Sequence, residues 1–143
     1  ATDAAAASDS EAADLAEIET VFAAYWDAVI ESENGPVSDP AIFDGIATGG
    51  AVEMQLTNVN NLINDGIRRI GAPALSEPVI HLAGDTARVE VCVDISDWGA
   101  AVGDHTAPPQ PSDPSPRVVD MERIDGAWLV TDQIDPSEAT ITC

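Results

Sequence analysis

Residues 79–95 read VIHLAGDTARVEVCVDI, two strand-like runs on either side of Gly84-Asp85. Apolar and polar residues alternate in both runs, which is the period of a half-buried β-strand. A two-residue turn with Gly first closes such a hairpin and pairs Ile80 with Val89. The apolar side chains of both strands then share one face, so the stretch predicts its register as well as its strands.

A second hairpin is predicted from residues 118–125 and 127–134, which flank Asp125-Gly126. The face of this hairpin that turns toward the core is apolar except at its ends. With the first hairpin it makes a four-stranded antiparallel meander. The predicted register pairs Arg123 with Trp128, Met121 with Val130 and Val119 with Asp132.

A long, proline-rich connection, residues 97–116, joins the two hairpins. One interpretation is a flexible or polyproline-like loop, and the other is a surface that a partner protein recognises. For Trp98 the alternative to a partner contact is that it clamps the loop onto the core. The candidate partner-binding residues are Trp98, Pro108, Pro109 and Pro111.

Three helices are predicted before the hairpins. Over residues 11–33 apolar residues recur at three- and four-residue steps, as on an amphipathic helix. Residues 38–44 begin with Ser-Asp-Pro and predict a short second helix. A third is predicted over residues 50–70, with Gly71-Ala72-Pro73 as its stop.

These elements predict an α+β fold in which three N-terminal helices pack on a curved four-stranded antiparallel sheet. A chain of 143 residues is expected to form a single domain, here residues 11–143. Residues 1–10 are small and polar and predict a flexible tether, like the segment that follows a signal or lipid-attachment site.

Three short motifs carry a family resemblance: residues 24–27 (AYWD), 68–73 (RRIGAP) and 123–130 (RIDGAWLV). Their order resembles the cone-shaped nuclear transport factor 2-like superfamily, which includes SnoaL-like and ketosteroid-isomerase-like proteins. Residues 91–98 (VCVDISDW), with a terminal Cys, are similar to small secreted proteins and lipoproteins of actinobacteria, a group whose resemblance implies no activity. No motif matches the catalytic positions of the superfamily's enzymes, so no catalytic residue is transferred from them.

Acidic residues dominate the charge: 26 Asp and Glu against 5 basic residues give a net charge of -21. So negative a field repels phosphates, which excludes nucleic acid and anionic membrane surfaces as expected partners. Solubility or a saline habitat explains the acidity, and attraction of a basic partner is the functional alternative. No apolar run approaches the roughly 20 residues of a membrane-spanning helix.

Cys92 and Cys143 are the only cysteines. His81 and His105 could join them on a metal, but at spacings that match no zinc pattern. A catalytic thiol is disfavoured at Cys92, because acidic residues flank it and oppose a thiolate. We therefore predict a disulfide between the two, and with it an extracytoplasmic location.

Three polar residues are candidates for the inside of the fold: Tyr25, Asp132 and Arg123. A carboxylate in an apolar cavity can act as a general base, and a tyrosine hydroxyl can donate to an oxyanion. The structural alternative is that Tyr25 only packs and that Arg123 and Asp132 pair at the rim of the sheet. No motif predicts a metal or a cofactor.

Three functions remain open from the sequence. The first is a non-catalytic extracytoplasmic binding or accessory module of the cell envelope, with an envelope protein or a small apolar molecule as its partner. The second is a small-molecule carrier or acid-base enzyme that uses the interior of the cone. The third is a structural subunit of an envelope complex. Either a monomer or a homodimer is compatible with the polar outer face of the sheet.

Overall fold

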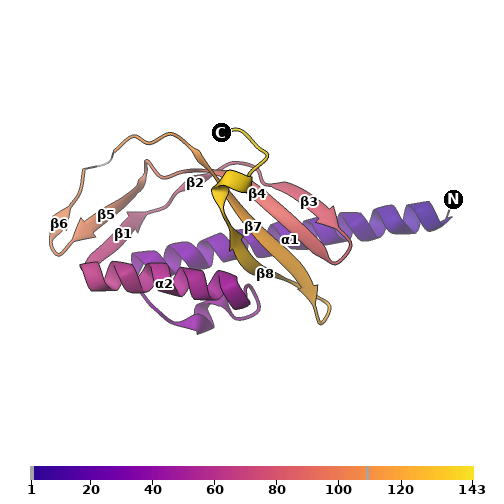
Figure 1. Ribbon diagram of the computed structural model, residues 1–143, viewed down its shortest axis with the longest axis horizontal. Helices are drawn as coiled ribbons and strands as arrows, with labels where there is room; N and C mark the ends of the chain where they lie inside the picture. The colour runs from indigo at the N-terminus through magenta and orange to yellow at the C-terminus, as the bar shows by residue number, and fades with distance from the viewer. Residues whose placement is uncertain (1, 109) are drawn as a thin grey trace.

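Two α-helices pack against curled antiparallel β-sheets (Figure 1). The computed structural model describes residues 2–108 and 110–143. The long helix α1 (Thr2–Asn34) runs along the molecule with α2 (Gly49–Asp65) beside it, and a single 3-10 turn, η1 (Pro40–Phe43), lies between them in the chain. The other elements are β1 (Ile67–Gly71), β2 (Ala74–Leu75), β3 (Val79–Ala83), β4 (Thr86–Asp94), β5 (Trp98–Val102), β6 (His105–Thr106), β7 (Ser115–Ile124), β8 (Ala127–Ile134) and the 3-10 turn η2 (Pro136–Glu138).

Residues 67–102 form one long, bent hairpin. Its first arm is β1, β2 and β3, and its second is β4 and β5, paired antiparallel from Ile67–Val102 to Ala83–Thr86. The bend divides its strands between two sheets. One has the order β1-β5-β6, and the other has the order β2-β4-β7-β8, with β3 also paired to β4.

The bend between β1 and β2 is possible because residue 71 is a glycine. Its φ of +85° lies in the left-handed region, and a Cβ atom there would lie 2.6 Å from the carbonyl oxygen of Asp97. Only glycine meets both conditions without strain. The bend curls the sheet into the half-barrel that holds the core.

The predicted registers are confirmed next to both turns. In the first hairpin Ile80 pairs with Val89, and in the second Arg123 pairs with Trp128. The sheet itself differs from the prediction of four strands, because β1, β5 and β6 add a second sheet to the meander.

A β-bulge in the second hairpin makes the third predicted pair wrong. Met121 pairs with Val130 but Asp120 pairs with Asp132, so one extra residue lies on β8 between them. Beyond a bulge the side chains of a strand exchange faces. Val119 consequently pairs with Gln133, which takes the inner-face position predicted for Asp132.

The described residues contain two α-helices, where three were predicted. Residues 38–44 contain only the 3-10 turn η1, capped by the Asp39 side chain, which accepts a hydrogen bond from the backbone N–H of Ala41. α1 begins at Thr2, so its backbone includes residues predicted to form a tether. The flexible tether over residues 1–10 stays a prediction, and Ala1 lies outside the described residues.

The predicted third helix ends early and becomes a strand. Gly66 is its C-cap, with a left-handed φ of 69°, and its N–H bonds the carbonyl oxygens of Leu62 and Ile63. This geometry satisfies carbonyls that a helix end leaves open. The chain then leaves the helix, and residues 67–71 form β1 instead of a last helical turn.

The core lies between α1 and the inner face of the sheet. Ile18, Phe22, Tyr25 and Val29 are buried on α1, as their spacing predicts. Opposite them, alternate residues of three strands are buried: Ala87, Val89, Val91 and Val93 of β4, Val119 and Met121 of β7, and Trp128 and Val130 of β8. Burial of such side chains contributes about 1.5–3 kcal/mol each before the entropy of ordering is subtracted.

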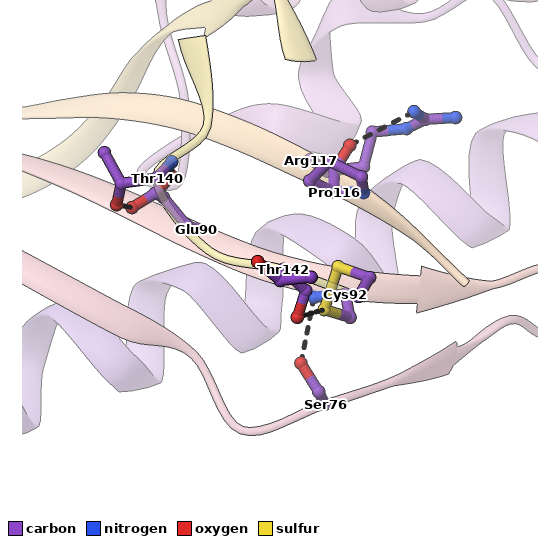
Figure 2. The surroundings of a disulfide bond; sticks show 8 residues. Ser76, Glu90, Cys92, Pro116, Arg117, Thr140 and Thr142 are labelled. Carbon is purple, nitrogen blue, oxygen red and sulfur yellow. Dashed lines mark hydrogen bonds between the residues drawn. A yellow bond between two sulfur atoms is a disulfide. The ribbon is translucent and has the colours of Figure 1, made fainter. Parts of the chain in front are cut away.

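The outer face of β4 holds the C-terminal segment, as Figure 2 shows. Cys92 and Cys143 form the predicted disulfide, with their Cα atoms 5.6 Å apart. Two residues earlier on the same face, the buried carboxylate of Glu90 accepts hydrogen bonds from the backbone N–H and the hydroxyl of Thr140. A covalent bond and a buried carboxylate thus fix the end of the described chain to the central strand.

Candidate functional site

A cavity of about 360 Å³ lies inside the cone, between α1, α2 and the inner faces of both sheets. Its walls combine two tryptophans and several aliphatic residues with a set of polar side chains. Ligand sites of folded proteins have this size and this mixed lining. The polar lining residues are Tyr25, Glu33, Gln55, Asn58, Arg69, Arg117 and Gln133.

Tyr25 lines the cavity and is almost fully buried. The side-chain amide of Gln133 donates a 2.7 Å hydrogen bond to its hydroxyl oxygen. Burial raises the pKa of Tyr25 to about 12, with the Gln133 bond lowering it and the charge of Glu33 raising it. The phenol therefore keeps its proton, and because its oxygen accepts from Gln133, that proton is free to be donated to a ligand.

Glu33 lies one turn beyond Val29 on α1 and is held by a buried amide. Gln55 Nε2 donates to Glu33 Oε2 at 2.7 Å and also to the hydroxyl of Ser32 at 3.2 Å. Burial raises the pKa of the Glu33 carboxyl, against the Gln55 bond and the attraction of Arg69 and Arg117. A partly desolvated carboxyl of this kind keeps its proton to a higher pH than an exposed one does.

Arg69 is positioned by the indole of Trp98. Its guanidinium carbon lies 4.0 Å from the ring centroid, and Nη2 donates to the Trp98 carbonyl oxygen at 2.7 Å. Trp98 is in turn held by Asn34, whose side-chain oxygen accepts from the indole N–H at 3.0 Å. Burial lowers the pKa of Arg69, with the charge of Glu33 opposing, and a guanidinium stays charged regardless.

Two hydrogen-bond donors in the lining residues are buried without a partner. They are the indole Nε1 of Trp26 and Nε of Arg69. Buried N–H groups are nearly always bonded, and leaving one unpaired costs about 1–3 kcal/mol. Both nitrogens are fully buried, so they are unpaired polar atoms within the wall and the cavity does not reach them.

Of the three predicted interior residues, only Tyr25 lines the cavity. Asp132 is exposed on the other side of β8, because the bulge exchanges its face with that of Gln133. Arg123 lies at the far end of the second hairpin, 2.7 Å from Asp14 and 3.0 Å from Asp85. The structure does not bring Tyr25, Asp132 and Arg123 together.

The predicted partner-binding residues differ in their exposure to solvent. Trp98 is only 7% exposed, belongs to the core and stacks on Arg69, and its role as a partner contact or as a clamp for the loop stays a prediction. Pro108 and Pro111 are exposed, and Pro109 lies outside the described residues. Recognition of a partner by these prolines stays a prediction.

Sequence reasoning missed most of the polar lining. Glu33 follows Trp26 and Val29 on the buried face of the helix. The spacing of the apolar residues could therefore have predicted that Glu33 points into the cavity. The place of Arg69 could not be predicted, because the residue was assigned to a helix and lies in β1. The inward position of Gln133 was missed because it depends on the bulge in β8.

Neither a metal cluster nor a membrane span is found in the part of the chain that the structure describes. No group of three or more His, Cys, Asp or Glu side chains there could hold a metal ion. None of its helices is long and apolar enough to cross a membrane.

No family model matches the chain, and no curated protein matches it either. Similar solved structures exist at low sequence identity. An NTF2-like protein with a cystatin-like fold from Novosphingobium aromaticivorans aligns with a TM-score of 0.55 at 15% identity, covering 90% of this chain and 84% of that one. A protein of unknown function from Mycobacterium tuberculosis aligns with a TM-score of 0.56 at 13% identity, covering 92% and 80%. A structure from Catenulispora acidiphila has a TM-score of 0.55 at 15% identity, covering 87% and 91%.

These likenesses define the class of fold. The chain has the cone-shaped, nuclear transport factor 2-like fold that its motifs resemble, with a curled antiparallel sheet closed by helices. Identities this low show a shared fold, and function must be argued from the cavity.

Proposed function

We propose that this protein is a non-catalytic binding module of the extracytoplasmic space that holds a small organic molecule inside its cone. The disulfide supports the compartment, because such bonds persist where the surroundings are oxidising. Secretion, a membrane tether and an actinobacterial source belong to the same proposal. The similar folds from Mycobacterium tuberculosis and Catenulispora acidiphila support the last of these.

One observation carries the proposal: a cavity of about 360 Å³ whose wall combines apolar side chains with the polar groups of Tyr25, Glu33 and Arg69. A cavity of this size and lining is typical of a site for a small organic ligand. A ligand that fills it would cover the apolar walls and could pair with the polar side chains. Binding would therefore stabilise the folded state by mass action.

Acid-base catalysis is a second candidate, supported by the carboxyl of Glu33 and the phenol of Tyr25. One could remove a proton from a bound substrate while the other donates to the developing oxyanion. The variant Tyr25→Phe would then lose turnover while still binding substrate. In a binding module it would alter only affinity.

Native mass spectrometry of protein purified from its own source tests the binding function. We expect extra mass of a small organic molecule that is lost on denaturation. Ile95 is 37% exposed and lines the cavity, so Ile95→Trp should fold and should abolish the extra mass by filling the opening. Ile124→Trp is a matched control, because Ile124 is also 37% exposed but lies outside the cavity lining.

A wild-type mass equal to the bare chain with its disulfide would contradict the proposal. So would a bound molecule that Ile95→Trp retains. A complex with a second polypeptide would instead favour the structural subunit of an envelope complex, which stays a prediction. Deletion of residues 104–115 should abolish such docking if the proline-rich loop makes it.

A further inference from the structure

We infer that the ligand of the cavity is an organic acid with a single negative charge and a flat, apolar body. This inference rests on the proposed binding function and specifies the chemistry of its ligand. It is carried by the two arginines of the cavity wall and by the apolar residues that line the same cavity.

The arginines are divided unevenly between the surface and the cavity. In a chain of net charge -21, Arg88 pairs with Asp120 and Arg123 pairs with Asp14 and Asp85. Among the described residues, the two arginines of the cavity wall, Arg69 and Arg117, form no such ion pair. Arg68, which is exposed on β1, also forms no ion pair among the described residues, so two of the three arginines without one line the cavity.

The guanidinium groups of the cavity wall suit a carboxylate. Arg69 is fixed by its stacking on Trp98 and by the hydrogen bond that its Nη2 donates to the Trp98 carbonyl oxygen. Arg117, which is exposed, contributes a second guanidinium to the lining. An ionised carboxylate accepts such bonds about twice as strongly as a neutral carbonyl does.

The charge of the ligand follows from the charges in the wall. Arg69 and Arg117 are positive, and Glu33 is the acidic residue of the lining. With Glu33 ionised the three groups carry one net positive charge, which one ligand charge balances. Gln55 already bonds Glu33, so this carboxylate is held by the protein and the arginine donors remain for the ligand.

The rest of the wall specifies an apolar body. Trp26, Val29, Val118 and Ile134 line the same cavity. Indole rings prefer flat partners that stack on their face or meet it edge-on. A planar hydrocarbon with one carboxylate therefore matches both parts of the site.

Isothermal titration calorimetry with 2-naphthoate and its neutral amide, 2-naphthamide, tests the inference. We expect 2-naphthoate to bind the wild-type protein at least about tenfold more tightly, since one charge-assisted bond is worth about 1.5–3 kcal/mol. Arg69→Gln and Arg117→Gln should each reduce this preference. Arg68→Gln is the control: it removes the same charge from the neighbouring, outward-facing position of β1 and should change nothing.

Three results would overturn the inference. One is equal affinity for the acid and the amide, which would leave the binding function intact with a neutral ligand. Another is an equal effect of Arg68→Gln and Arg69→Gln. The preference for the acid over the amide would then come from the overall charge of the protein and not from the cavity. The third is that neither compound binds. In that event native mass spectrometry decides the binding function on its own. Circular dichroism of each variant checks the fold, and exposed Arg117 provides the variant least able to disturb it.

Discussion

Glu90 is a charged residue whose side chain is completely buried on the outer face of β4. Burial raises the pKa of its carboxyl, but the hydrogen bonds from Thr140 and the nearby His81 outweigh burial, and the pKa lies below its ordinary value of 4.5. A carboxyl whose pKa is lower in the folded state stabilises the fold above its unfolded pKa. That contribution is lost as the pH falls through the folded value.

We therefore predict that Glu90→Gln destabilises the protein by about 1.5 kcal/mol at neutral pH, the worth of its charge-assisted bonds. The gap between wild type and variant should close as the pH falls well below 4.5, where both side chains are neutral. Urea unfolding at several pH values measures this. The exposed Glu122→Gln serves as the control, and a gap that is independent of pH would contradict the assignment.

At the scale of the residue, the sequence predicts the position of a side chain where that position depends only on its neighbours along the chain. Tyr25 sits where the helical stripe puts it. Asp132 does not, because a single extra residue in β8 exchanges it with Gln133, and nothing local marks the bulge. Arg123 finds Asp14, which is distant in sequence, so its partner could not be predicted from the hairpin alone.

At the scale of the element, the end of α2 depends on one glycine. Gly66 has a positive φ of 69°, and a Cβ atom added there would have no heavy atom within 4 Å. Gly66→Ala thus changes the backbone energy without a steric clash. We predict a loss of about 1 kcal/mol, measured by urea unfolding.

Gly99→Ala is the matched control for that measurement. Gly99 lies in β5 with an ordinary φ, and a Cβ there would meet its nearest atom, the Ile70 carbonyl oxygen, at 3.8 Å. Alanine should be neutral at this position. Equal losses for the two variants would show that the helix end does not need the left-handed conformation.

Among the elements, the hairpins were predictable and β1 was not. Gly84-Asp85 and Asp125-Gly126 carry their turn signals locally, and alternation of side chains fixes the register beside them. Residues 67–71 continue an apolar helical period from α2, yet they pair with residues 98–102 and become a strand. Tertiary pairing overrides the local pattern there, and the short η1 shows the opposite case, in which a helix start signal is not followed by a helix.

At the scale of the whole molecule, the disulfide holds together parts of the chain that are far apart. It joins residues separated by 51 positions, and closing a loop of this size restricts the unfolded chain far more than the folded one. The C-terminal segment is also held by Glu90, so the bond and the carboxylate act on the same region.

Replacing both cysteines with serine should cost about 2–4 kcal/mol of unfolding free energy. The protein should still fold, because the core between α1 and the sheet does not include the sulfur atoms. Equilibrium unfolding measures the loss. A thiol assay on denatured, unreduced wild-type protein should find no free sulfhydryl, and two free thiols would contradict both the bond in solution and the oxidising compartment.

The bent hairpin of residues 67–102 also sets the order in which the molecule can assemble. Its arms meet beside the two-residue turn and can close pair by pair outward from Gly84-Asp85 at little entropic cost. β7 must instead find β4 across the long proline-rich connection, a contact of much greater separation in the chain. We expect the hairpin to form early and the docking of β7 to limit the folding rate, so that shortening the connection speeds folding while leaving the rate of unfolding almost unchanged.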